Sequence, residues 1–262
     1  MIEKLLPGLW RVGGRCWNGR NAALTPDGGN SYLLSPAGTG KAALIDCGYM
    51  SCKQAIEANI RQAGVRCEDL SDLLLTHSHF DHAEAAGQWR KDYGLSVGIS
   101  QVAAEHLANG DLRLTGVHAH DPKTRWQPFA VDHPLADGAP MEAAGLACTP
   151  YAMPGHTPDS MLLTVELEGG KVGFCGDITF GRNGLGQLGN VGWLCMLWKS
   201  DLRDYRRSLK RLAGMRFDLL LPGHGDPLVG QAAAGQAIAA SLATVEHLLA
   251  DPATRNFGME ID

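Results

Sequence analysis

The sequence contains no apolar run that approaches the ~18 residues needed to cross a membrane, so we expect no membrane-spanning segment. Its first residues, MIEKLLPGLW, lack the basic stretch and long apolar run of a secretory signal peptide, and we expect none. Positive charge is not in excess either, because the net charge is −5. Binding to a phosphate backbone needs a basic surface, so nucleic acid is excluded as the main partner.

Paired cysteines are also absent. The chain has seven cysteines, an odd number, and no two of them are spaced as Cys-X-X-Cys. A small secreted protein held together by disulfides usually has an even, regularly spaced set. The sequence therefore favours a reduced, cytoplasmic protein.

Apolar residues make up 45% of the chain, which is ordinary for a globular protein with a sizeable core. Strands are predicted at 30–34, 41–46, 73–76, 146–153, 161–167, 171–175 and 217–221. Helices are predicted at 51–63, with Ser51 as N-cap, and at 82–91, 202–212 and 231–249. This alternation predicts a layered α/β architecture. Because no interdomain linker is visible, residues 1–262 are predicted to form one domain.

The most informative segment is THSHFDH, residues 76–82. In an extended chain, residues two apart point the same way, so His77 and His79 can converge on one metal ion. Asp81 and His82 follow where the backbone turns into a helix, and they can face a second ion. Imidazole and carboxylate are ligands that a borderline cation such as zinc prefers. A polar loop with accidental histidines is the alternative, but shuffling would give this spacing in only roughly one chain in a thousand.

Three further motifs follow, each at the end of a predicted strand. They are PGHTPDS with His156, CGD with Asp177 and LPGHGDP with His224. A glycine precedes each of these residues, which would let the backbone come close to a crowded centre. Singly, each motif has an ordinary structural explanation, but their order after the histidine-rich loop indicates a metal site.

With these motifs the sequence resembles the metallo-β-lactamase superfamily from residue 30 to about residue 227. The resemblance implies a four-layer αββα sandwich with two zinc ions at the strand ends along one edge. It implies that the first ion is held by His77, His79 and His156, the second by Asp81, His82 and His224, and that Asp177 bridges both. Asp46, in LIDCG, matches the family's first motif, and we expect it to support the metal loop through hydrogen bonds.

The same resemblance implies hydrolysis by a hydroxide that bridges two cations. Such cations lower the pKa of a shared water towards ~7 and polarise the bond to be cleaved. Asp81 is then placed to orient the nucleophile and accept its proton, which makes it the predicted catalytic residue. No Ser-His or Cys-His nucleophile is required.

The motifs define the substrate less closely. Asp177 stands where class B β-lactamases carry cysteine or serine, which argues against β-lactam hydrolysis. Glyoxalase-type thioesterases append a helical domain after the last histidine, whereas the stretch after His224 is long enough for one helix and a tail. Ligand spacing resembles the acyl-homoserine lactonases, although Phe180 stands where those enzymes have tyrosine. The prediction is a lactonase- or glyoxalase-II-like hydrolase acting on a carboxylic ester, lactone or thioester.

Two alternatives use the same residues. Persulfide dioxygenases share the fold and the motif but bind one iron through two histidines and an aspartate, for which His77, His156 and Asp177 would serve. β-Lactam or phosphodiester hydrolysis at the same site is the other alternative, and the acidic balance disfavours phosphodiesters.

Substrate contacts are predicted from residues 178–198, which carry five glycines and end in an apolar run with Trp193 and Trp198. Phe180 and, in the loop 13–20, Trp17 complete the predicted set. If exposed, these residues favour a small molecule with an apolar acyl or aryl group, or alternatively a homodimer contact. Packing inside the protein is their ordinary role.

Two other polar clusters receive a structural interpretation. His118 and His120 form a second His-X-His pair without a third ligand motif nearby, which favours a solvated or substrate-facing loop. The basic residues of 202–212 lie on the polar side of the predicted helix, diluted by two aspartates, which favours a solvated face over nucleic-acid binding.

Overall fold

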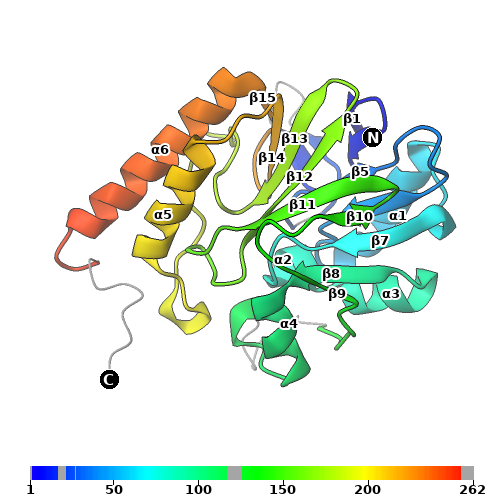
Figure 1. Ribbon diagram of the computed structural model, residues 1–262, viewed down its shortest axis with the longest axis horizontal. Coiled ribbons are helices and arrows are strands. Elements are labelled where there is room, and N and C mark those ends of the chain that lie inside the picture. The colour runs from blue at the N-terminus through cyan, green and yellow to red at the C-terminus, as the bar shows by residue number, and fades with distance from the viewer. Residues whose placement is uncertain (1, 17–21, 27, 117–125, 255–262) are drawn as a thin grey trace.

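The computed structural model describes residues 2–16, 22–26, 28–116 and 126–254. Two sheets face each other, and helices cover the outer face of each, as Figure 1 shows. This is the four-layer αββα arrangement that the family resemblance implies. None of the described helices is long and apolar enough to cross a membrane.

The first sheet is built from the N-terminal half of the chain. Its strands, in spatial order, are β1 (Glu3–Leu6), β2 (Leu9–Arg11), β5 (Tyr32–Leu34), β6 (Ala42–Ile45), β7 (Leu70–Leu74), β8 (Ser96–Ser100) and β9 (His133–Leu135). Pairing is antiparallel from β1 to β6 and parallel from β6 to β9. The helices of this half are α1 (Lys53–Gln62), α2 (Phe80–Ala83), α3 (Ala86–Tyr93) and α4 (Gln101–Ala108). A separate ribbon pairs β3 (Arg15–Cys16) with β4 (Ala22–Ala23).

The second sheet is built from the C-terminal half. Its strands, again in spatial order, are β10 (Met141–Ala143), β11 (Leu146–Ala152), β12 (Met161–Leu167), β13 (Gly170–Gly176), β14 (Leu219–Pro222) and β15 (Leu228–Val229). Only the β13–β14 pair is parallel, so both strands end at the same edge. Helices α5 (Leu202–Ala213) and α6 (Gly230–Ala250) cover its outer face (Figure 1).

Alternating side chains of the central strands produce three apolar layers. In β7, Leu73 packs beneath the helices of the first half, whereas Leu74 lies between the two sheets. In β14, Leu220 packs against α5 and α6, whereas Leu221 faces the first sheet. Consecutive leucines therefore serve different layers, which is why these strands read as continuous apolar runs.

Helix α5 begins at a carboxylate cap and is strongly amphipathic. Asp201 accepts hydrogen bonds from the backbone N–H groups of Arg203 and Asp204 at 2.7 and 2.9 Å. Tyr205 and Leu209 are buried on its inner face. Its basic residues Arg206, Arg207, Lys210 and Arg211 are exposed, and Arg203 is partly exposed, which confirms the predicted solvated face.

The predicted helix at 82–91 is helical over most of its length but not continuous, because the structure divides this segment between α2 and α3. The N–H of Ala85 donates to the carbonyl of Gly48 at 3.2 Å, and the carbonyl of His82 accepts from Cys47 at 2.8 Å. These bonds to the loop after β6 replace helical bonds. No glycine or proline marks such a break, so it follows from tertiary contacts.

The predicted N-cap at Ser51 is also wrong. Residues Met50–Cys52 form a 3-10 turn before α1, and no side chain caps the first turn of α1. Glu84 Oε2 accepts a hydrogen bond from the N–H of Met50 at 2.8 Å. A carboxylate distant in sequence thus satisfies a donor at the start of this helical segment.

Candidate metal centre

Asp46 anchors the histidine-rich loop that follows β7. It has a positive φ of 55° and ends β6 by turning its carboxylate towards that loop. Its Oδ1 accepts the backbone N–H of Thr76 at 2.8 Å, and its Oδ2 accepts the Thr76 hydroxyl at 2.7 Å. Oδ2 also lies 2.9 Å from Nδ1 of His82. The predicted supporting role of Asp46 is confirmed.

The same hydrogen bonds orient two imidazoles. The Thr76 hydroxyl has one proton, which it gives to Asp46, so it accepts from Nδ1 of His77 at 3.2 Å. His82 Nδ1 likewise donates to Asp46. In both residues Nε2 is therefore the nitrogen left with its lone pair directed away from the anchor.

The second sheet contributes three residues from the ends of its strands. His156 follows β11, Asp177 follows β13 and His224 follows β14. The residue Ser200 donates to the carbonyl of His156 at 2.6 Å, and the phenol of Tyr205 donates to the carbonyl of Asp177 at 2.8 Å. The segment around α5 thus holds the backbone of two of these residues.

Glycine is required at two positions beside these residues. A Cβ on Gly223 would lie 2.3 Å from Oδ1 of Asp177, as predicted for a backbone that approaches the centre. Gly155 has a φ of 143°, and a Cβ there would lie 2.2 Å from Cα of Tyr205. This second glycine therefore serves close packing against α5 rather than approach to the centre.

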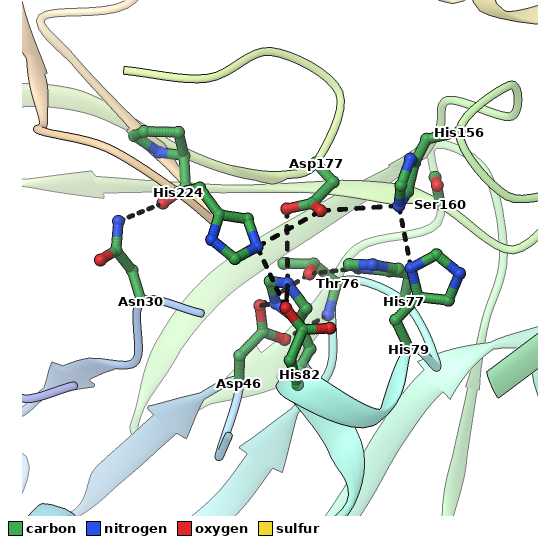
Figure 2. Close-up of polar contacts among 12 residues, drawn as sticks. Asn30, Asp46, Thr76, His77, His79, His82, His156, Ser160, Asp177 and His224 are labelled. Atoms are coloured by element: carbon green, nitrogen blue, oxygen red, sulfur yellow. Dashed lines mark hydrogen bonds and ion pairs between the residues drawn. The ribbon is translucent and has the colours of Figure 1, made fainter. Parts of the chain in front are cut away.

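The seven side chains predicted from the sequence converge at one edge of the sandwich, where imidazoles and carboxylates point toward one another (Figure 2). Their nitrogen and oxygen atoms form three groups, each within 4.8 Å: His77, His79 and His156; His77, His82 and Asp177; Asp81, His82 and His224. Each group takes two residues from the segment that follows β7 of the first sheet and one residue that follows a strand of the second sheet.

Asp177 lies between the outer groups. Its Oδ2 is 3.5 Å from Nε2 of His156 and 3.5 Å from Nε2 of His224. Asp81 Oδ2 is 3.1 Å from the same atom of His224. A carboxylate with imidazoles on both sides has the position that a residue shared by two cations would need.

The donor atoms fit cations. His77 Nε2 is buried and has no hydrogen-bond partner among the described residues, and His82 Nε2 lies 3.3 Å from Asp177 Oδ1, a contact that is an ion pair only when the imidazole is protonated. A buried polar atom without a partner costs free energy, and the donor atoms of His77, His82 and Asp177 all lie within 4.8 Å of one another. A divalent cation would satisfy all of them, and the His/Asp set suits zinc or iron.

Three imidazoles are held in the neutral form that a ligand requires. Burial lowers the pKa of His77 well below its usual value and that of His79 to about 3, and neighbouring imidazoles add to both effects. Burial also lowers the pKa of His156. Neutral imidazoles keep a lone pair, so this cluster is suited to binding metal rather than to carrying protons.

The other two imidazoles favour positive charge. Burial opposes protonation of His82, but the carboxylates of Asp81 and Asp177 outweigh it and raise the pKa well above the usual value. The pKa of His224 is raised against burial by the same two carboxylates. Positive charge is thus stabilised beside Asp81 and Asp177, whether a proton or a metal ion supplies it.

A cavity of about 290 Å³ opens on this cluster. Its walls include three of the predicted substrate residues, Phe180, Trp193 and Trp198. Trp193 is 83% exposed, whereas Trp198 is buried and its ring lies edge-on to His79 at 5.0 Å. Trp198 therefore also supports a candidate ligand. Trp17, His118 and His120 lie outside the described residues.

Sequence reasoning missed several residues of the site. Tyr49 and Phe80 line the cavity, and Phe80 stands inside the THSHFDH motif itself. Asp159 is buried and accepts the backbone N–H of Ser78 at 2.8 Å, between two candidate ligands. Its place in the PGHTPDS motif was the available signal. Ser200 and Tyr205 carried no comparable signal, because they reach the centre only through the fold.

Comparison with curated proteins finds relatives of modest identity. The chain is 27% identical over 208 residues to a β-lactamase-like protein 2 homolog of Drosophila melanogaster, covering 78% of this chain and 61% of that protein. It is 28% identical over 203 residues to the thioesterase pkgB of Emericella nidulans, covering 77% of this chain and 47% of that protein. It is 26% identical over 243 residues to a hydroxyacylglutathione hydrolase of a Bradyrhizobium species, covering 88% and 82%. The chain thus spans about half to three fifths of the length of the first two of these relatives.

Solved structures share the fold. A metallo-β-lactamase from Cronobacter sakazakii with a HARLDQ motif superposes with a TM-score of 0.73 at 22% identity, covering 97% of this chain and 99% of the other. The subclass B3 metallo-β-lactamase BJP-1 of Bradyrhizobium japonicum superposes with a TM-score of 0.73 at 19% identity, covering 95% of this chain and 93% of the other. Residues 24–224 match the family model of the metallo-β-lactamase superfamily. With sandwich, motifs and family model in agreement, the chain belongs to the metallo-β-lactamase superfamily.

Proposed function

We propose that this protein is a dinuclear metallohydrolase that cleaves carboxylic ester, lactone or thioester bonds of substrates with an apolar acyl or aryl group. The observation that carries the proposal is the convergence of seven His and Asp side chains at the floor of one cavity. Relatives named as a thioesterase and a hydroxyacylglutathione hydrolase support an acyl substrate.

The proposed ligand sets correspond to the first and third groups above, with Asp177 shared as the family resemblance implies. His77, His79 and His156 would hold the first ion, Asp81, His82 and His224 the second, and Asp177 would be shared. Zinc is proposed because the ligands are imidazoles and carboxylates. When bound, the two ions supply an activated water and polarise the substrate carbonyl.

Asp81 is the proposed catalytic residue. Its side chain is 18% exposed and lines the cavity, so a substrate and a water molecule can reach it. His224 and His82 contact its Oδ2 at 3.1 and 3.6 Å, which fixes the carboxylate in place. From this position Asp81 orients the attacking water and accepts its proton as the bond to the acyl carbon forms.

The cavity wall favours an uncharged acyl group over a phosphodiester. Its described lining residues include Tyr49, Phe80, Phe180 and two tryptophans but neither lysine nor arginine. A phosphodiester would need positive charge beyond the ions, whereas an acyl chain or aryl ring needs apolar surface. Asp177 in place of cysteine or serine continues to argue against β-lactams.

Metal content is the first expected result. Because all seven positions carry His or Asp, elemental analysis should find about two zinc-class ions per chain. Removing them with a chelator should abolish hydrolysis, and adding zinc should restore it. One iron per chain, no zinc and oxygen consumption with a persulfide substrate would instead establish the dioxygenase alternative.

Selectivity for the acyl group tests the cavity wall. Trp193→Ala should raise KM for long-chain and aryl thioesters by roughly threefold to tenfold and change KM for acetyl thioesters little, because uniform apolar binding is lost. Trp198 is unsuited to this test because it contacts His79.

Leu185→Ala is the matched control, because Leu185 is also 83% exposed but does not line the cavity. It should leave the chain-length profile as in the wild type. A Trp193→Ala enzyme weakened equally for every chain length would contradict the assignment of this wall to the acyl group.

A further inference from the structure

A buried carboxylate lies beside the histidine-rich loop without a cation of its own. Asp159 is 1% exposed, and its Oδ2 accepts the backbone N–H of Ser78 at 2.8 Å. Burial raises the pKa of its carboxyl, and nearby donors of Thr157 and Ser78 offset only part of that effect. No lysine, arginine or histidine among the described residues forms an ion pair with it. The fold thus keeps a negative charge where, by itself, that charge lowers stability.

The turn that carries Asp159 is fastened to the histidine-rich loop. This turn joins β11 to β12, and its last bond to the loop runs from the N–H of Met161 to the carbonyl of Thr76 at 2.8 Å. Within the turn, the hydroxyls of Thr157 and Ser160 lie 2.8 Å apart. The position of the Asp159 carboxylate is therefore set by the fold, and it cannot turn out into water.

Asp46 has the corresponding position at the other group of candidate ligands. It accepts the N–H of Thr76 and lies 2.9 Å from Nδ1 of His82. Asp159 accepts the N–H of Ser78, which is the backbone donor between the two loop histidines of the first group. Each proposed ion thus has one buried carboxylate that is bonded to the backbone of the loop and is not itself a ligand.

The two proposed ions differ in the charge of their own ligands. His77, His79 and His156 are neutral imidazoles, because burial lowers the pKa of each. The second ion has the carboxylate of Asp81 among its ligands, whereas the first has only a share in Asp177. In a buried site a dication surrounded mainly by neutral ligands is stabilised by a further negative charge nearby.

We infer that Asp159 is a positioning residue of the first metal site, whose charge compensates an ion held by neutral imidazoles and whose hydrogen bond holds the loop that carries two of them. The inference rests on the proposed function. Together with Asp46, Asp81 and Asp177, Asp159 supplies the negative charge that two divalent cations would balance. Without the ions this charge destabilises the protein, and with them it strengthens binding.

The test replaces Asp159 by asparagine, which keeps the shape and an acceptor for the N–H of Ser78 but removes the charge. The dissociation constant for zinc is measured by competition with a chromophoric chelator, in the wild-type background and in a His224→Ala background that lacks a ligand of the second ion. Asp159→Asn should raise the constant for the first ion by roughly tenfold to a hundredfold in both backgrounds.

The metal-free protein provides the second measurement. Metal-free Asp159→Asn should melt at the same temperature as the metal-free wild type or above it, because an uncompensated buried charge has been removed. Weaker zinc binding together with undiminished metal-free stability is a combination that a purely structural carboxylate would not produce.

Two further variants complete the set. Asp159→Ala removes the acceptor as well as the charge and should weaken zinc binding further. Asp72→Asn is the matched control, because Asp72 is a buried carboxylate in β7 that accepts the N–H of Ala144 at 3.1 Å, and it should leave the zinc affinity unchanged. If Asp159→Asn fails to fold even with zinc, Asp159→Ser repeats the test with a smaller uncharged side chain.

The possible failures are distinguishable. A wild-type protein that binds no zinc-class ion would refute the proposed function. If the wild type binds zinc and Asp159→Asn binds it equally tightly, or if metal-free Asp159→Asn melts below the metal-free wild type, the proposed metal centre stands and the role of Asp159 is overturned.

Discussion

Replacing Asp81 by asparagine is expected to lower kcat by at least about a hundredfold while the fold survives. Asparagine keeps the size of the side chain but loses the negative charge that accepts the proton of the attacking water. It also weakens the contact with Nε2 of His224 and the proposed hold on the second ion. Positioning and proton acceptance are lost together, which is why the effect is large.

The measurement is kcat on a thioester substrate, with metal content and a melting curve for the same preparation. Asp69→Asn is the matched control, because Asp69 is exposed and precedes β7, at the opposite end of the strand from the loop, so its replacement should leave kcat unchanged. Near-normal turnover by Asp81→Asn at normal metal content would remove Asp81 from the mechanism.

Arg11→Met should lower the free energy of unfolding by about 3–5 kcal/mol, the cost of breaking a buried ion pair from one side. The Arg11 side chain is fully buried, and it contacts Glu3 and Asp226 at 2.5 and 3.3 Å. It also donates to the carbonyl of Gly225, next to His224. Removing the guanidinium leaves two carboxylates with little water around them.

Urea unfolding measures this difference. Lys41→Met is the control, because Lys41 and Glu142 form an ion pair with side chains 53% and 67% exposed, worth at most about 1 kcal/mol. Adding Asp226→Asn to Arg11→Met should recover part of the loss, since one of the two negative charges that faced Arg11 disappears. Additive losses in the double variant would show that the two residues do not interact.

The candidate ligands could be found from the sequence because their chemistry is local. The THSHFDH loop carries four of them within seven residues, and His156, Asp177 and His224 each follow a strand and a glycine. Strand ends at one edge of a sheet lie close together, so the pattern predicts convergence without knowledge of distances. A layered α/β architecture followed from alternating strands and helices, and the family resemblance implied its αββα order.

The rest depends on contacts between distant segments. Strands β1, β2, β8 and β9 have too few residues or too little alternation to be predicted, and they form through pairing with their neighbours. The break between α2 and α3 follows from bonds to the loop after β6. Trp198 was predicted as a substrate contact. Its packing on His79 could not be predicted, because no pattern in the sequence brings these two residues together.

Each donor group combines two residues from the first half of the chain with one from the second half, so the centre forms only when the two halves pack together. During synthesis the first sheet is complete before β11, β13 and β14 emerge, and that half alone contains none of the three groups. A cation therefore finds a complete set of donors only after the two sheets have docked. Metal binding is then a late event that reports correct assembly and, by favouring the docked state alone, stabilises the seam between the halves.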